Sequence, residues 1–291
     1  MKVVALRRAI LRWYRRAARD LPWRRTRDPY AILVSEIMLQ QTQVSRVIPK
    51  YRSFMKRFPT LSALAKATLA DVLRAWSGLG YNGRARRLWE CARAAVRDHR
   101  GALPRDADAL RGLPGIGRYT AGAVASVAFG ARTPAVDTNV RRVLGRALDG
   151  ADGTTDRRAW ELAELALPSR AAGEWNQAVM DVGALFCRPM PKCASCPARR
   201  ACRGASVAGR TRAPAPKRAR QQPYAGSRRF FRGRIVATLT SVPALSLLDL
   251  GEQVKPGFQK TDVPWLRELV TDLQRDGLVA LDRKRRIVRL A

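Results

Sequence analysis

Residues 112–122 read GLPGIGRYTAG, and this stretch decides how the rest of the chain is interpreted. Gly115 and Gly117 flank an isoleucine, and the small residues that follow predict a helix over 118–129. Such a turn leaves backbone N–H groups free, and the N-terminus of the next helix adds partial positive charge, so the two together can bind a phosphate. The alternative is an ordinary corner between helices that needs glycine only for a positive φ.

The charge of the chain favours the phosphate interpretation. Of 291 residues, 56 are Lys or Arg and only 23 are Asp or Glu, which gives a net charge of +33. No acidic residue occurs between Asp181 and Asp249. A genome rich in G and C would explain arginine in place of lysine, but it would not explain the shortage of acidic residues. An excess of this size favours a polyanionic partner, and we expect nucleic acid.

The N-terminal sequence does not predict a membrane or secreted protein. No apolar run reaches the ~20 residues of a transmembrane helix. The first residues, MKVVALRRAILRWYRR, are interrupted by Arg7 and Arg8, which predicts an amphipathic helix and not a signal peptide. We therefore expect a cytoplasmic, nucleoid-associated monomer, whose cysteines are ligands and not disulfides.

The hydrophobic pattern predicts a mostly α protein followed by a small module. Residues 1–202 show no strand alternation, and Asp28 with Pro29 predicts a capped helix start. Residues 203–228 have the composition of a basic linker. Residues 229–291 predict three helices and a terminal hairpin, the outline of a winged helix. Further helices are predicted over 45–57, 61–76, 83–99, 106–111, 118–129, 138–148, 156–166 and 173–187.

Four cysteines predict a metal centre. Cys187, Cys193, Cys196 and Cys202 are spaced C-x5-C-x2-C-x5-C, so four thiolates can enclose one centre. The spacing alone does not separate an iron–sulfur cluster from a structural zinc, which also accepts four cysteines. Cys91 lies apart on a predicted helix and is expected to be a buried core residue.

Two carboxylates are candidates for chemistry. Glu36 lies in YAILVSEIMLQ, an almost wholly apolar helix, where poor solvation should raise its pKa toward that of a general acid at neutral pH. A partly exposed Glu on an amphipathic helix is the alternative. Asp137 begins VDTNVRRVLGRAL, where capping of a helix is its default role, although its second oxygen is then still available.

Two stretches have the composition of base-recognition loops. The segment GLGYNGRARR places Tyr81 in a glycine-rich turn beside Arg84, Arg86 and Arg87, which suits base stacking and phosphate contact. Gln40 and Gln41 follow the Glu36 helix and offer amide groups to base edges.

These motifs resemble the helix-hairpin-helix base-excision DNA glycosylases. LPGIGRYTAG is similar to the hairpin of that superfamily, and VSEIMLQQTQV, LGYNGRAR, VDTNVRRV and WNQAVMDVGALFC resemble its MutY-type adenine glycosylase branch, in collinear order over about 1–202. The resemblance implies a two-lobed fold. A six-helix barrel would come from 23–136, and an iron–sulfur lobe from 1–22 with 137–210. Bent double-stranded DNA would lie between the lobes with its target base flipped out.

The resemblance also implies roles for residues. Glu36 would protonate adenine at N7, Asp137 would stabilise the oxocarbenium-like sugar, and Asn139 would support that carboxylate. The four cysteines would hold a [4Fe-4S] cluster, although five residues separate the first two where the family usually has six. Positions that match the family's base pocket and DNA contacts are Trp23, Arg24, Leu39, Gln40, Gln41, Thr42, Tyr81, Gly115, Gly117 and Asp181.

Tyr119 separates this chain from one branch of the superfamily. Endonuclease III-like relatives have a lysine here that attacks the sugar and makes them lyases. A tyrosine forms no Schiff base, so we expect a monofunctional enzyme. Mismatch thymine glycosylases also carry tyrosine, so removal of thymine or uracil opposite guanine is the alternative. Glu36 and the LQQT and LGY motifs favour adenine, opposite 8-oxoguanine or guanine. The large Nudix-like domain of many MutY proteins is not found in 203–291.

Overall fold

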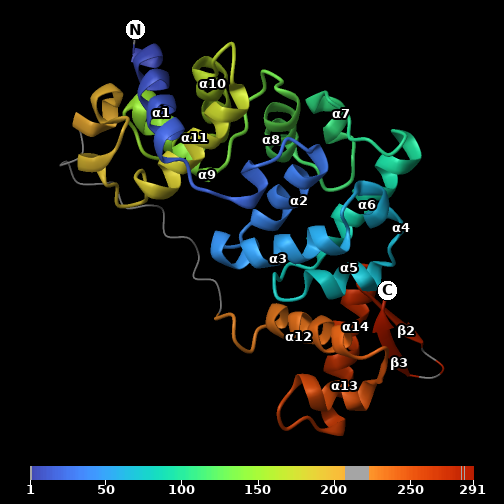
Figure 1. Ribbon diagram of the computed structural model, residues 1–291. Coiled ribbons are helices and arrows are strands. Elements are labelled where there is room, and N and C mark those ends of the chain that lie inside the picture. Colours follow the sequence, from blue (N-terminus) through green and yellow to red (C-terminus); the bar gives the residue numbers. More distant parts are fainter. Residues whose placement is uncertain (1, 207–222, 283, 285) are drawn as a thin grey trace. The chain divides into compact units, whose positions relative to one another are not determined.

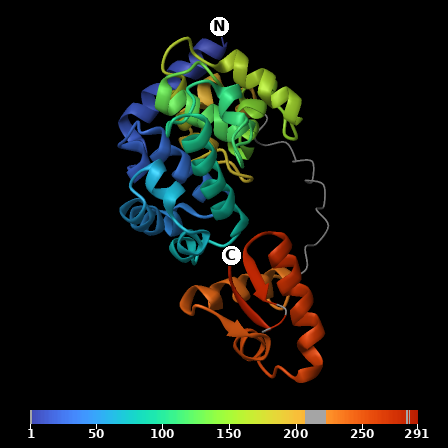
Figure 2. The same ribbon diagram turned by 90° about the vertical axis from the view of Figure 1, so that its right-hand side faces the viewer.

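The computed structural model describes residues 2–206, 223–282, 284 and 286–291. The chain divides into two compact units, one built from Met1–Glu36 and Leu103–Lys217 and the other from Ile37–Ala102 and Arg218–Ala291. Figures 1 and 2 trace the elements of both. Most of the predicted basic linker, 207–222, lies outside the described residues, and the lobe boundaries drawn from the resemblance stay a prediction.

The first unit is helical in its described part, and its core lies among α1 (Lys2–Ala17), α9 (Thr138–Leu144), α10 (Asp156–Ala166) and α11 (Ala172–Leu185). Leu6 and Ile10 of α1 are fully buried in the same cluster as Val140, Trp160 and Trp175. This burial explains the amphipathic pattern of the N-terminal segment. The helices are α1 (Lys2–Ala17), α7 (Ala107–Arg111), α8 (Arg118–Phe129), α9 (Thr138–Leu144), α10 (Asp156–Ala166) and α11 (Ala172–Leu185), with a π-helical turn at Gly145–Asp149 and 3-10 turns at Pro22–Arg24, Cys193–Ser195, Arg199–Ala201 and Arg203–Ser206.

The GLPGIG turn joins α7 to α8, as the sequence predicts. Gly115 has φ +76°, a left-handed conformation that favours glycine, and Gly117 is the residue that precedes α8. Farther along α8, a Cβ at Gly122 would lie 2.1 Å from the Pro134 carbonyl oxygen. The small residues of α8 therefore let the backbone of 134–135 approach it closely.

Helix α2 (Pro29–Leu39) begins where the sequence predicts. The Asp28 carboxylate accepts hydrogen bonds from the backbone N–H groups of Tyr30 (3.1 Å) and Ala31 (3.3 Å). The division between the compact units falls after Glu36, so the last residues of α2 belong to the second unit.

The second unit contains α3 (Val44–Arg57), α4 (Leu61–Lys66), α5 (Leu69–Trp76) and α6 (Gly83–Asp98). The prediction of one helix over 61–76 is wrong. The Thr68 hydroxyl accepts a hydrogen bond from the Asp71 N–H at 3.1 Å and starts α5 as a separate helix. Phe54 of α3 and Trp76 of α5 pack edge to face in the core, with ring centroids 6.0 Å apart.

The C-terminal module has the predicted three helices and hairpin, with one additional strand. Its elements are α12 (Arg228–Ser241), β1 (Leu245–Ser246), α13 (Leu247–Val254), a 3-10 turn (Lys260–Asp262), α14 (Val263–Arg275), β2 (Val279–Asp282) and β3 (Ile287–Leu290). The strands form an antiparallel sheet in the order β1-β3-β2. Within it Leu281 pairs with Val288. Its assignment as a winged helix stays a prediction.

The fold class is mostly α, which confirms the prediction. The described helices include none with the length and apolar character that a membrane crossing requires.

Candidate active site

Glu36 and Tyr119 form the centre of the candidate site. Glu36 is half-buried on α2, and the Tyr119 hydroxyl, from the first turn of α8, donates a hydrogen bond of 2.7 Å to its Oε2. Burial and the negative charge of Asp137 raise the pKa of the Glu36 carboxyl to about 7, although the Tyr119 hydrogen bond and Arg24 act in the opposite direction. At neutral pH the carboxyl is therefore protonated in a large fraction of molecules, as a general acid requires.

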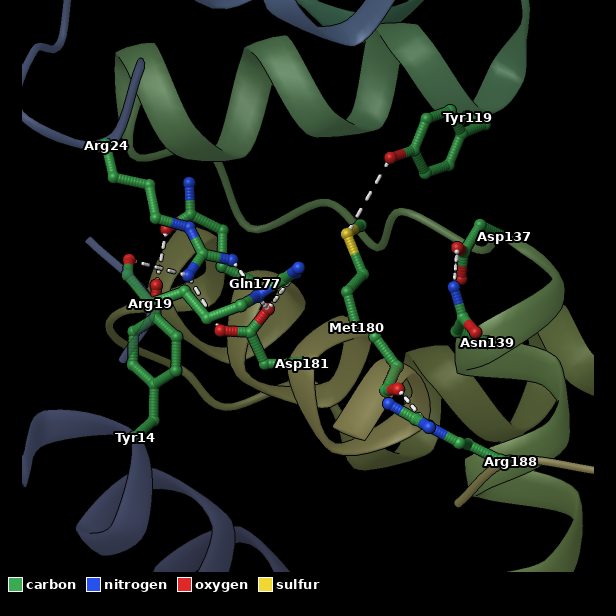
Figure 3. A network of polar contacts seen from close by, with 11 residues as sticks. Tyr14, Arg19, Arg24, Tyr119, Asp137, Asn139, Gln177, Met180, Asp181 and Arg188 are labelled. Atoms are coloured by element: carbon green, nitrogen blue, oxygen red, sulfur yellow. Dashed lines mark hydrogen bonds and ion pairs between the residues drawn. The ribbon is translucent and has the colours of Figure 1, made fainter. Parts of the chain in front are cut away.

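Tyr119 remains a hydrogen-bond donor in this setting. Burial and the neighbouring carboxylates raise its pKa well above the ordinary value, so the phenol keeps its proton. Its hydroxyl also lies 3.7 Å from the Met180 sulfur (Figure 3). When Glu36 is protonated, the Tyr119 proton can turn to this sulfur and leave the phenol oxygen as an acceptor, so both forms of the carboxyl are accommodated.

Asp137 caps α9 and is held by a second donor. Its Oδ1 accepts from the Val140 N–H at 2.7 Å, and its Oδ2 accepts from the Asn139 amide at 2.8 Å (Figure 3). The default capping role is thus confirmed, and Asn139 supports the carboxylate as the resemblance implies. A Cβ at Gly183 would lie 2.5 Å from the Asn139 Cβ, so only glycine allows α11 to pack this closely on Asn139.

A chain of hydrogen bonds leads from Asp137 to Cys187, the first of the four clustered cysteines. Arg142 donates to the Asn139 Oδ1 at 2.7 Å and also to the carbonyl oxygen of Cys187. Arg142 was not predicted as a site residue, because one arginine among so many carries no local signal in the sequence.

The predicted base-pocket residues of this unit lie together. Asp181 is fully buried and accepts two hydrogen bonds from Arg24, at 2.7 and 2.8 Å, while Arg19 donates to the same carboxylate at 2.9 Å (Figure 3). Burial acts to raise the pKa of Asp181, but the hydrogen bonds and charges of the two arginines outweigh it and lower the pKa. Trp23, which precedes Arg24 in the sequence, is also buried. Arg19 was not predicted as a site residue.

The other predicted DNA contacts of residues 39–42 and 81 belong to the second unit. Leu39 ends α2, and Gln40, Gln41 and Thr42 form the turn that follows. Tyr81 lies in the turn after α5 and is 61% exposed. The structure thus groups the predicted residues in two sets, one for each unit. Arg84 is buried, so the expectation that it contacts phosphate from the surface is wrong.

The four clustered cysteines are free and partly buried. Burial raises the pKa of the Cys196 thiol to about 11; the hydrogen bond from the Ala198 backbone lowers it, and the charges of the other three cysteines add to the rise. Within the described part of the chain, no group of three or more His, Cys, Asp or Glu side chains has the arrangement of a metal site. The donor set itself, four free thiols within sixteen residues, has the chemistry of a centre that needs four thiolates. Cys91 is buried in the core, as predicted.

Comparison with known proteins decides the family. The model of the HhH-GPD superfamily of base excision DNA repair proteins matches residues 34–166. The adenine DNA glycosylase of Mycolicibacterium smegmatis is 47% identical over 235 residues, which cover 79% of this chain and 78% of the relative. The chain belongs to the adenine DNA glycosylase family.

Further relatives and solved structures are similar to this chain over about 70% of its length. Human adenine DNA glycosylase is 47% identical, and the match covers 69% of this chain but only 40% of the human protein. The chain thus spans less than half the length of its mammalian relatives. Among solved structures, a thermostable thymine-DNA glycosylase matches with a TM-score of 0.66 and 33% identity, over 71% of this chain and 97% of that one. An endonuclease III structure matches with a TM-score of 0.62 at 24% identity, over 72% and 99% of the respective chains, and shows the shared fold.

The raised pKa of Glu36 predicts a pH-dependent gain in stability for Glu36→Gln. The folded state binds the proton more tightly than the unfolded state, so the wild-type protein loses stability as the pH rises from 4.5 to about 7. A shift of this size corresponds to about 3 kcal/mol. Glutamine keeps an acceptor for Tyr119 and carries no charge. We expect urea unfolding to show little difference near pH 4 and a gain of up to about 3 kcal/mol at pH 8. If the free energy of unfolding of the variant differed from that of the wild type by the same amount at pH 4 and pH 8, the raised pKa of Glu36 would be contradicted.

Proposed function

We propose that the protein is a monofunctional DNA glycosylase that removes adenine paired with 8-oxoguanine or guanine in double-stranded DNA. The observation that carries the proposal is the 2.7 Å contact of Tyr119 with a half-buried Glu36 whose pKa lies at about 7. A pure DNA-binding protein has no use for a protonatable carboxyl in a chain with a net charge of +33. The family assignment supports the same activity.

The chemistry addresses a poor leaving group. The adenine anion does not leave readily, so Glu36 donates its proton to N7 as the bond between C1′ and N9 breaks and its electron pair passes to the base. The sugar becomes oxocarbenium-like, and the Asp137 carboxylate stabilises the positive charge. Water then attacks C1′, and the Glu36 carboxylate accepts a proton from that water. The products are free adenine and an abasic site.

The remaining site residues bind and orient the DNA in this proposal. The turn at Gly115 and Gly117 binds a backbone phosphate with its N–H groups. Trp23, Arg24 and Asp181 line the pocket for the flipped adenine. Gln41 and Tyr81 enter the duplex at the opposite base. The neighbouring residues Leu39, Gln40 and Thr42 also contact the DNA.

The four clustered cysteines would hold a [4Fe-4S] cluster, with a structural zinc as the alternative. Either centre would cross-link 187–202 and stabilise the loop that follows α11. Iron with acid-labile sulfide in the purified protein supports the cluster, whereas one zinc per chain supports the alternative.

Tyr119 predicts the absence of lyase activity. The wild-type protein should form no borohydride-trappable complex with DNA, because a phenol makes no Schiff base. Tyr119→Lys places an amine in the first turn of α8 and should introduce trapping while slowing hydrolysis, because the donor to Glu36 is lost. Gel electrophoresis of borohydride-treated reactions measures the covalent complex, and Tyr119→Phe is the matched control without an amine. Trapping by the wild-type protein would contradict the proposal.

The released base tests the proposal directly. A duplex with adenine opposite 8-oxoguanine should yield free adenine, identified by mass spectrometry, in amounts equal to the abasic sites formed. The similarity to a thymine-DNA glycosylase, which also fits Tyr119, makes thymine from a T:G duplex the second candidate product. Release of thymine without adenine would overturn the proposal.

A further inference from the structure

Arg84 lies in an unusual position for an arginine. It stands in the first turn of α6, where the helix dipole disfavours a positive charge, and it is only 8% exposed. Burial lowers the pKa of its guanidinium to about 10, although Tyr81 acts in the opposite direction. Its Nε is buried and has no hydrogen-bond partner among the residues that the structure describes. Burial of a charged guanidinium with an unsatisfied nitrogen costs free energy, so we expect the hydrogen bonds of this side chain to have a specific role.

The guanidinium joins the two turns that carry the proposed opposite-base residues. Nη1 donates to carbonyl oxygens at the C-terminal end of α2 and in the turn that follows it. Nη2 donates to the same turn after α2 and to the turn after α5. The acceptors of Nη1 are the carbonyl oxygens of Ile37 (2.9 Å), Met38 (3.0 Å) and Gln40 (2.5 Å), and those of Nη2 are Thr42 Oγ1 (3.0 Å) and the carbonyl oxygens of Gly80 (3.2 Å) and Leu79 (3.4 Å).

Two of these acceptors immediately precede non-glycine residues with left-handed backbone. Gln41 has φ +55° and Tyr81 has φ +48°, which is disfavoured for residues with side chains. The carbonyl before Gln41 belongs to Gln40 and the carbonyl before Tyr81 belongs to Gly80, and Arg84 binds both. One side chain therefore fixes the peptide plane that leads into each of the two residues.

The same guanidinium also positions the Tyr81 ring. Its central carbon lies 5.4 Å from the ring centroids of Trp76 and Tyr81, within the range of cation–π attraction. The Trp76 indole in turn donates to the Gly80 carbonyl at 3.1 Å. Tyr81 is thus oriented although more than half of its surface is exposed.

We propose that Arg84 is a positioning residue that holds Gln41 and Tyr81 as one prearranged pair for the base opposite the excised adenine. The inference rests on the proposed function, in which these two side chains enter the duplex. A prearranged pair loses little conformational freedom when it binds, so its contacts contribute to discrimination between mispaired and matched DNA. Because its guanidinium binds the turns that carry Gln41 and Tyr81, Arg84 acts on recognition and not on bond cleavage.

Only arginine suits this position. Its planar fork presents donors in two directions and reaches both turns, whereas a lysine ammonium is a single point charge. Arg84→Lys keeps the charge and loses the bridge, which makes it the informative substitution.

The test measures a specificity ratio. It compares the dissociation constant for a fully matched duplex with that for an A:8-oxoguanine duplex whose target adenosine carries a 2′-fluorine that resists hydrolysis. Arg84→Lys should lower this ratio by about tenfold or more. The affinity for matched DNA and the single-turnover rate at saturating enzyme should stay near the wild-type values. Arg97→Lys, the same change at an exposed position of α6, is the control and should leave the ratio unchanged.

Introducing Arg84→Lys into a Gln41→Ala/Tyr81→Ala background separates the possible failures. If Arg84 acts through these two residues, the double alanine variant lowers the ratio and Arg84→Lys lowers it no further. A further fall by the full wild-type factor would overturn the positioning role. An unchanged ratio in the double alanine variant would refute the insertion of Gln41 and Tyr81, and the positioning role with it, while the adenine-release assay still tests the activity.

If thermal melting shows that Arg84→Lys does not fold, Thr42→Val removes one acceptor of the Arg84 guanidinium and should lower the ratio by about threefold. An unchanged ratio would overturn the proposal.

Discussion

Glu36→Gln is expected to lower the single-turnover rate of adenine excision by about 10²- to 10⁴-fold. The amide fits the same space and still accepts a hydrogen bond from Tyr119, but it has no acidic proton for N7. Duplex binding should stay near the wild-type level, since the substitution removes one buried carboxyl from a protein with a net charge of +33. Glu161→Gln, at an exposed ion pair on α10, is the matched control and should leave the rate unchanged.

The pH dependence of the rate identifies the proton donor. Because the pKa of Glu36 is raised to about 7, the protonated fraction is high below this pH and falls as the pH increases. The wild-type rate should therefore decline about tenfold per pH unit above pH 8. The residual rate of Glu36→Gln should show no such decline in this range. A variant that retains the wild-type rate, or the same pH profile, would exclude Glu36 as the donor.

Asp137→Asn is expected to lower the excision rate by about 10²- to 10³-fold, because the amide removes the negative charge that stabilises the sugar cation. Asparagine can still cap α9 through its oxygen. Its NH₂ group then faces the Asn139 amide, whose own oxygen is held by Arg142 at 2.7 Å, so a modest loss of stability is also expected.

A matched comparison separates the loss of charge from the loss of fold. Asp156→Asn changes a carboxylate in the first turn of α10 and should leave the excision rate unchanged. Thermal melting checks that Asp137→Asn is folded at the assay temperature. An excision rate within about threefold of wild type in a folded Asp137→Asn variant would show that this charge has no part in the reaction.

Local features of the sequence predict much of the fold. Asp28, Asp137 and the glycine turn at 112–117 act through residues within four positions of themselves, so their caps and turns can be recognised without a structure. The single helix expected over 61–76 is wrong because Thr68 caps a second helix inside an otherwise helical pattern. Strand β1 was missed, since two residues show no alternation and depend on pairing with β3.

The candidate site was predicted only where residue type is informative. Glu36 stands out as one carboxylate in an apolar helix, and Tyr119 stands out by its place after the glycine turn. Arg19, Arg84 and Arg142 cannot be recognised as polar centres from the sequence, because each has a partner that is distant in sequence and the chain is full of surface arginines. Only the structure distinguishes a buried guanidinium from an exposed one.

The most direct test of the central claim is strand cleavage with four duplexes, A:8-oxoguanine, A:G, T:G and U:G, each incubated with the protein and analysed with and without alkali. We predict cleavage of the two adenine duplexes that requires alkali, because the enzyme leaves an abasic site and does not cut the strand. Cleavage of T:G or U:G without cleavage of either adenine duplex would contradict the claim. Cleavage of the adenine duplexes without alkali would contradict the assignment of a monofunctional enzyme.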